Sequence, residues 1–202
     1  MTEGTNKTKK ISIVGDFKTG KTTLAMEFKK KNSGKEMQHL PKQHDSFKKQ
    51  VIIDGDSYEV EIIDTSSNED YVRFRSISYK DSDFFILCFA IDDVNSFKAV
   101  ESYWIHELNE RAPKVPCILV GLKSDLKNSK EIQQKLQEKN ETFVTIDKGL
   151  KLSKKIGAFD YLEVSSFLNV NVDEIIDKCL RCDPKTQNVR RKSKSEGDCC
   201  IC

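Results

Sequence analysis

The chain has 202 residues, of which 37% are apolar and 33% are charged. This length suits one domain with polar tails. Its longest apolar run, Phe84 to Ile91, is far shorter than the about 20 residues of a transmembrane helix, and its first residues lack the apolar core of a signal peptide. We therefore expect neither a membrane-spanning nor a secreted protein.

The net charge of +2 is located at one end of the chain. Residues 183–202 hold five basic and three acidic residues, and the remainder holds 29 of each. A nucleic-acid-binding domain usually carries its basic residues on a folded surface, so we expect no nucleic-acid partner. An odd number of cysteines, seven, without a secretory signal favours the reducing cytosol.

The first half of the chain alternates strand-like and helical patterns. Residues 1–9 are polar and are predicted to be disordered. Residues 33–46 are polar and nearly unpatterned, which is typical of a long functional loop. The predicted elements are a strand over 10–15, a helix over 21–31, and strands over 47–53 and 58–63 joined by a hairpin turn at Asp54-Gly55-Asp56.

The second half continues the alternation, which predicts an α/β sheet with crossover helices and one antiparallel strand. Asn171 and Glu174 resemble a helix-capping pair. Cys179 and Cys182 form a C-x-x-C, which could supply two of the four ligands of a zinc site, but the sequence has no second pair at a zinc spacing. Helical periodicity favours a core position for Cys179 instead. The predicted elements are strands over 83–91, 115–121 and 159–164, helices over 97–108, 148–156 and 172–180, and a polar insertion over 127–140.

A glycine-bounded segment after the first strand matches the pattern G-x-x-x-x-G-K-S/T in full. The backbone N–H groups of such a loop point at an anion, and the helix that follows adds its dipole. The lysine supplies charge to the β- and γ-phosphates, and the next hydroxyl ligates Mg²⁺. The predicted phosphate loop is made of Gly15, Asp16, Phe17, Lys18, Thr19, Gly20, Lys21 and Thr22, with Thr23 beside it.

Two acidic residues at strand ends complete the predicted site. Asp64 closes the strand over 58–63 and is placed to hold a metal ion with Thr22, although an acid at a strand end also commonly serves as a helix N-cap. Asp125 follows the buried strand over 115–121. Its carboxylate can accept hydrogen bonds from N1–H and the 2-amino group of guanine, and it would repel the N1 acceptor of adenine.

Other segments carry a family resemblance. They are Asp64-Thr65 with Glu69-Asp70-Tyr71, Arg75-Ser76-Ile77-Ser78-Tyr79, Cys88-Phe89-Ala90-Ile91-Asp92 and Ile156-Gly157-Ala158-Phe159. With the phosphate loop ahead of them, residues 10–182 resemble the Rho family of the Ras superfamily of small GTPases.

This resemblance implies a small G domain with a mixed six-stranded sheet, five flanking helices and an insert helix over 127–140. It implies a switch between GTP and GDP with Mg²⁺, and signalling to the actin cytoskeleton. The implied partners are effectors, exchange factors, activating proteins and a GDP-dissociation inhibitor. The implied base-site residues are Lys123, Asp125, Ser165 and Ser166, and the implied effector region is His39, Leu40, Pro41, Lys42, Gln43, His44, Asp45, Ser46 and Phe47.

The chain departs from the family on the γ-phosphate side. Phe17 stands where the family usually has Gly, and Asn68 stands at the place of the water-orienting Gln. We therefore expect Asn68 to be a degenerate catalytic position, with Lys21 retained, and GTP hydrolysis to be very slow. The other departures are Lys42 for the magnesium-ligating Thr, Ser67 for Gly, Leu122 for Asn or Thr, Phe167 for Lys, and no aromatic ring between Lys29 and Ser46.

These losses leave two functions open. The first is a nucleotide-binding switch with defective hydrolysis. The second is a pseudo-GTPase scaffold that binds effectors at a membrane without nucleotide, which the loss of base contacts at Leu122 favours.

The tail over 183–202 is predicted to be a flexible basic linker that ends in a prenylation motif. Cys199 is the expected prenyl acceptor of a C-a-a-X sequence. The alternative is a doubly prenylated Cys200-Ile201-Cys202, which resembles Rab proteins. One prenyl chain beside basic residues predicts that the protein lies on the cytoplasmic face of a membrane. We expect this to be the plasma membrane, with a second pool of the protein in the cytosol.

Overall fold

The computed structural model describes residues 7–33 and 46–182. Its six strands form one mixed sheet in the order β2-β3-β1-β4-β5-β6, in which only the β2–β3 pair is antiparallel. The strands are β1 (Lys7–Gly15), β2 (Ser46–Ile53), β3 (Asp56–Asp64), β4 (Phe84–Ala90), β5 (Cys117–Leu122) and β6 (Tyr161–Val164). The predicted sheet is confirmed.

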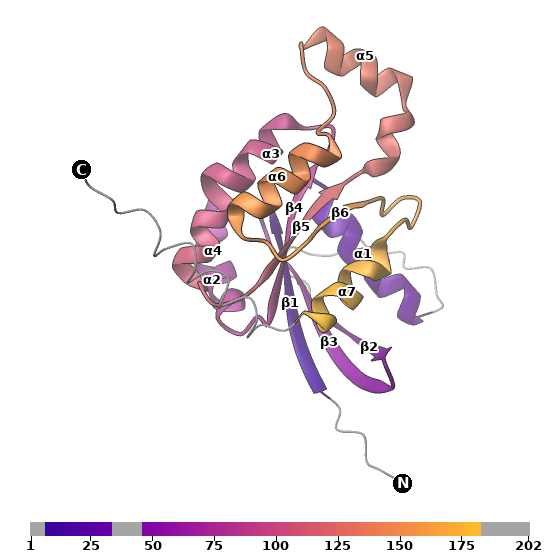
Figure 1. The fold of residues 1–202 in the computed structure, drawn as a ribbon. Helices are drawn as coiled ribbons and strands as arrows, with labels where there is room; N and C mark the ends of the chain where they lie inside the picture. The colour runs from indigo at the N-terminus through magenta and orange to yellow at the C-terminus, as the bar shows by residue number, and fades with distance from the viewer. Residues whose placement is uncertain (1–6, 34–45, 183–202) are drawn as a thin grey trace, which may run out of the picture.

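Helices cover both faces of this sheet (Figure 1). Helices α1 and α7 lie on one face, α2, α3, α4 and α6 lie on the other, and α5 projects from the body. A π-helical segment, η2 (Val100–Trp104), joins α3 and α4 into one continuous helix, so five helical bodies flank the sheet and α5 is the predicted insert. The helices are α1 (Lys21–Ser33), α2 (Val72–Lys80), α3 (Val94–Ala99), α4 (Ile105–Arg111), α5 (Lys130–Glu138), α6 (Ile146–Ile156) and α7 (Val172–Arg181), with 3₁₀ helices η1 (Glu69–Tyr71) and η3 (Ser124–Asn128).

Strand β4 is buried along its whole length because it lies in the middle of a sheet covered on both sides. Its alternate residues supply two cores. Phe84, Ile86 and Cys88 belong to the core under α1 and α7, and Phe85 and Leu87 belong to the core under α2, α4 and α6. Cys179 is fully buried in the first core, as its periodicity predicts. No helix of the described residues is both long and apolar enough to cross a membrane.

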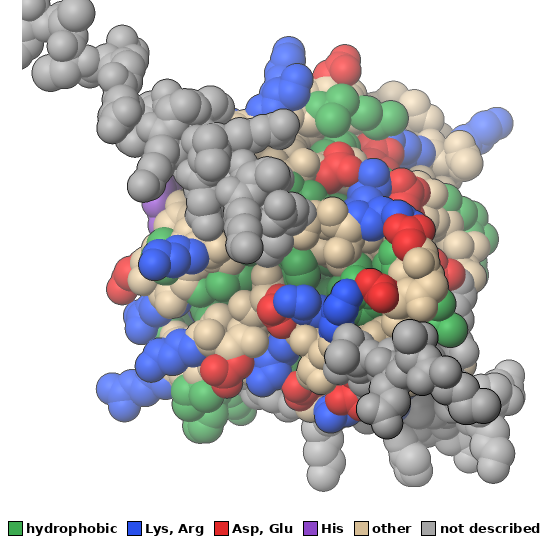
Figure 2. Space-filling model, turned by 60° about the horizontal axis from the view of Figure 1, so that its bottom comes forward, with side chains coloured by type: hydrophobic (Ala, Val, Ile, Leu, Met, Phe, Trp, Pro, Cys, Tyr) green, Lys and Arg blue, Asp and Glu red, His purple; other side chains and the backbone are tan. Residues whose placement is uncertain are grey.

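The predicted disordered segment 1–9 is wrong for residues 7–9, which form the start of β1 and pair with β3. Lysines at these positions resemble a solvated tail, but acidic partners neutralise them in the sheet: Lys7 Nζ lies 2.7 Å from Asp56 and Lys9 Nζ lies 2.8 Å from Asp83. Basic and acidic side chains are interspersed on the face that carries this end of the sheet (Figure 2).

Two local predictions have different outcomes. The hairpin is confirmed: Asp54 and Gly55 have φ of 52° and 89° between the paired residues Ile53 and Asp56, as a tight turn requires. The capping pair is wrong. Asn171 has a left-handed φ of 59°, and its side-chain amide donates to the carbonyl of Glu163 instead of capping α7.

Candidate nucleotide-binding site

The phosphate loop turns sharply between β1 and α1. Gly15 has a φ of 145°, and a Cβ there would lie 2.2 Å from the carbonyl oxygen of Cys88 in the neighbouring strand β4. Gly20, directly before α1, has a φ of 104°. Both positions therefore require glycine, and the turn directs the free N–H groups at the start of α1 into a cavity.

Lys21 lies beneath this loop and is only 7% exposed. Its Nζ donates to the carbonyl of Asp16 at 2.6 Å, and the Thr19 hydroxyl donates to the same carbonyl at 2.9 Å. Burial lowers the pKa of Lys21. An anionic ligand in the cavity would favour the charged form of this lysine, so the loop is built for a phosphate group.

Thr22 and Asp64 meet across the floor of the cavity. The Thr22 hydroxyl donates to Oδ2 of Asp64 at 2.6 Å. Asp64 is the last residue of β3, and the N-cap of the following helix is Asn68, so the alternative role of Asp64 as an N-cap is excluded. A hydroxyl and a carboxylate oxygen are the hard ligands that Mg²⁺ prefers, so these two residues fit a magnesium ion that also binds phosphates and water.

The phosphate loop opens into a cavity of about 400 Å³. A second cavity, of about 260 Å³, shares Gly20, Thr23 and Lys123 with it. The first is lined by Phe17, Lys18, Gly20, Lys21, Thr22, Thr23, Asp64, Thr65, Ser66, Ser67 and Lys123, and the second by Gly20, Thr23, Leu122, Lys123, Asp125, Leu126, Ser166 and Phe167.

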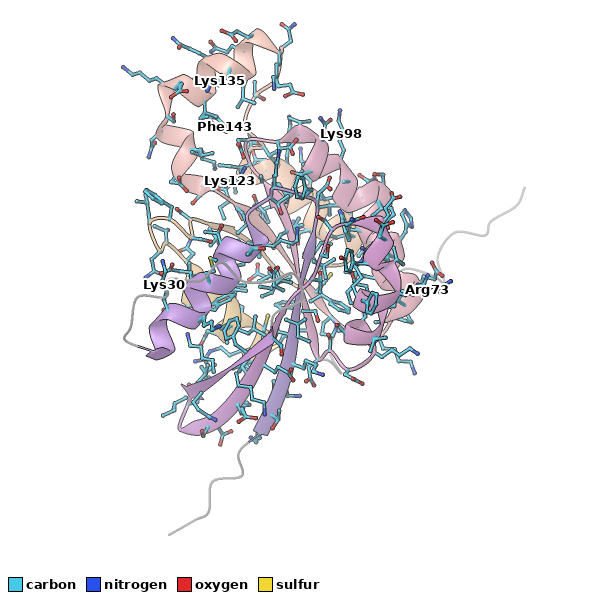
Figure 3. All side chains as sticks on the ribbon, turned by 180° about the vertical axis from the view of Figure 1, so that it is seen from behind. Lys30, Arg73, Lys98, Lys123, Lys135 and Phe143 are labelled. Atoms are coloured by element: carbon cyan, nitrogen blue, oxygen red, sulfur yellow. The ribbon has the colours of Figure 1, made fainter. Side chains whose placement is uncertain are left out.

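The second cavity has the residues predicted to hold a base. The Ser165 hydroxyl donates to Oδ1 of Asp125 at 2.6 Å and fixes this carboxylate, and Oδ2 is the oxygen that it leaves for a ligand. Lys123 has a left-handed φ of 64°, and its ammonium lies 3.2 Å from Asp92. Figure 3 shows Lys123 between α1 and the insert α5, at the end of the sheet where the two cavities join.

Some predicted residues support the cavities without lining them. Gly15, Asp16 and Thr19 shape the loop from behind, and Ser165 acts on Asp125. Asn68 is also absent from the described lining, and its Oδ1 accepts from the N–H of Asp70, 3.0 Å away, and caps η1. Ser46 and Phe47 begin β2, whereas residues 39–45 and Cys199 lie outside the described part of the chain.

Sequence reasoning missed a buried ionic network beside the cavity. Arg75 of α2 is 0% exposed and forms two hydrogen bonds of 2.8 Å with Glu107 of α4. The same guanidinium donates to the carbonyls of Ser66 and Asn68, at 3.3 and 2.7 Å. Tyr79 and Tyr103 also donate to Glu107, both at 2.9 Å. The network thus ties the loop after β3 to the helices, and no local sequence pattern marks it.

A phosphate loop, a magnesium-type oxygen pair and a fixed carboxylate in an adjoining cavity define a nucleotide-binding domain of the P-loop class. A model of the Ras family matches residues 10–183. The chain is 36% identical to the GTP-binding protein rho1 of Schizosaccharomyces pombe over 173 residues, which are 86% of this chain and 85% of rho1. It is 37% identical to the Rho-related protein racM of Dictyostelium discoideum over 175 residues, 87% of this chain and 89% of racM.

The chain therefore belongs to the Ras family and is a Rho-type small GTPase.

Proposed function

We propose that this Rho-type GTPase binds GTP and GDP with Mg²⁺, hydrolyses GTP very slowly, and signals to effectors from a membrane surface. The observation that carries the proposal is an asymmetry of the site. Its α/β-phosphate side keeps Lys21, Thr22 and Asp64, whereas its γ-phosphate side is altered at Phe17 and Asn68.

Two of the altered side chains bear on hydrolysis. Phe17 lines the phosphate cavity with 65% of its surface exposed, so its ring occupies space that an attacking water and an incoming arginine would need. The Asn68 side chain is one methylene shorter than Gln and is engaged in capping η1. Phosphoryl transfer depends on positioning and charge stabilisation, so both changes predict a slow reaction.

Replacing Lys21 tests nucleotide binding. Lys21→Ala is expected to weaken GDP binding by about 2–5 kcal/mol, because it removes a nearly buried charge from the phosphates. Lys30→Ala, toward the far end of the same helix (Figure 3), is the matched control because its side chain is exposed and lies outside both cavities. Isothermal titration with GDP and Mg²⁺ measures both variants after bound nucleotide has been removed. Equal affinities for Lys21→Ala and the control would contradict the assigned phosphate site.

The pseudo-GTPase scaffold remains the second candidate, and one observation favours it. Leu122 is 1% exposed and stands where the family has a polar base contact, so the base cavity has lost a hydrogen-bond partner. The open cavity over Lys21, Thr22 and Asp64 supports the nucleotide-binding proposal instead. A protein that is purified without bound nucleotide and then binds no guanine nucleotide in the titration would favour the scaffold over the nucleotide-binding switch.

Membrane attachment is part of the proposal and rests on the tail sequence. Cys199 stands at the prenyl-acceptor position of a C-a-a-X motif. The last twenty residues of the chain contain five basic residues, and all five precede Cys199. Cys199→Ser is expected to move a fluorescently tagged protein from membranes to the cytosol, because one prenyl chain and a basic cluster together give stable attachment. Unchanged membrane localisation would show that Cys200 and Cys202 suffice or that the motif is not used.

A further inference from the structure

The base cavity has large apolar side chains in its lining, and the inference drawn from them rests on the proposed function. Leu122, Leu126 and Phe167 line it, with Thr23, Lys123, Asp125 and Ser166 as its polar or charged side chains among the described residues. Phe167 is 85% exposed, more than any other large apolar side chain described. An aromatic ring at the edge of a cavity, left in water, gains stability when a flat ligand covers it.

The turn that carries Phe167 is closed by its own hydrogen bonds. Ser165 and Val170 form an antiparallel bridge, with N–H to carbonyl distances of 3.2 and 2.9 Å in the two directions. The N–H of Leu168 donates to the Ser165 hydroxyl at 3.0 Å, and that hydroxyl donates to Asp125. The ring is therefore attached to the same short network that fixes the base-reading carboxylate.

A second residue of the cavity lining, Lys123, is also held in place. The ion pair of Lys123 with Asp92 anchors the ammonium, so the aliphatic stem of Lys123 has little freedom where it lines the cavity. The sequence between Lys29 and Ser46 contains no Phe, Tyr or Trp, so that segment offers none of these larger rings for a base. Two aromatic residues line the two described cavities. Phe17 lines the phosphate cavity, and Phe167 lines the base cavity.

We propose that Phe167 is the aromatic platform on which the purine base of the nucleotide stacks. In this arrangement stacking supplies most of the affinity for the base, and the Asp125 carboxylate selects guanine through N1–H and the 2-amino group. Stacking tolerates any flat base, so Phe167 sets affinity and Asp125 sets specificity.

Phe167→Ala tests the platform. GDP affinity, measured by titration of the full chain after bound nucleotide has been removed, is expected to fall about 10- to 100-fold, because one base stacked on an aromatic side chain contributes affinity of this order. Phe167→Tyr keeps the ring and is expected to bind GDP within about threefold of the wild type. Leu168→Ala is the matched control, since Leu168 is a 58% exposed neighbour that does not line either described cavity.

Ribose 5-diphosphate, which lacks the base, separates stacking from a structural effect. Its affinity is expected to be the same for the wild type and Phe167→Ala. An equal loss for GDP and ribose 5-diphosphate, or unchanged GDP affinity in Phe167→Ala, would overturn the platform. A wild type that binds neither compound would instead overturn the proposed nucleotide binding, so the two failures are distinguishable.

Discussion

Restoring two side chains on the γ-phosphate side is expected to restore hydrolysis. The wild-type protein loaded with GTP should be stimulated less than about tenfold by a Rho activating protein, whereas Phe17→Gly with Asn68→Gln should recover a large part of the about 10³- to 10⁵-fold stimulation that an arginine finger provides. The reason is steric and chemical: the glycine vacates the cavity that Phe17 lines, and the longer amide reaches the water.

Single-turnover assays with radiolabelled GTP measure this difference directly. The variant with Asn68→Gln alone is the control, because Phe17 still lines the cavity and should still exclude the finger. Strong stimulation of the wild-type protein would contradict the assignment of a blocked γ-phosphate side. Lys42, which lies outside the described residues, is the same in both variants. It can limit the rate of hydrolysis that both reach, but it does not affect the difference in rate between them.

Removing Arg75 is expected to cause the largest loss of stability. Arg75→Ala leaves Glu107 buried without its cation, and breaking a buried pair in this way costs about 3–5 kcal/mol. Arg73→Ala is the matched control, because Arg73 lies on the same helix and is exposed (Figure 3). Urea denaturation measures the free energy of unfolding of both variants. A loss for Arg75→Ala within about 1 kcal/mol of the control would contradict a structural role for the pair.

The same pair predicts a pH dependence. Burial alone would raise the pKa of Glu107, but the hydrogen bonds from Arg75, Tyr79 and Tyr103 lower it below its usual 4.5. A carboxyl group whose pKa is lower in the folded state stabilises the fold above the unfolded pKa, and this stability is lost as the pH falls through the folded value. The wild-type protein should therefore lose stability below about pH 4.5, and Arg75→Ala should lose less over the same range.

Features encoded over a few residues could be predicted from the sequence. The phosphate loop follows from the glycine spacing, the hairpin from Asp54-Gly55, and the burial of Cys179 from helical periodicity. The oxygen pair of Thr22 and Asp64 also follows, because both residues stand at the end of the sheet where β1 and β3 lie side by side in parallel. These predictions needed only local patterns and the order of the elements.

Features that join distant residues could not be predicted in this way. Arg75 and Glu107 are 32 positions apart, and neither has a local signal that distinguishes it from a solvated charge. Lys7 and Lys9 pair in the sheet with β3, and their ammonium groups meet acidic residues 49 and 74 positions away. Asn171 satisfies the carbonyl of Glu163 rather than its own helix. In each case the partner that decides the structure is brought near only by the fold.

The nucleotide that remains bound through purification tests the central claim most directly. The protein is denatured, and the supernatant is separated by ion-exchange chromatography against GTP and GDP standards. A domain with an intact phosphate loop and defective hydrolysis is predicted to release about one guanine nucleotide per chain, with more GTP than GDP. A supernatant without guanine nucleotide would contradict the account, and a supernatant containing GDP alone would contradict its claim of slow hydrolysis.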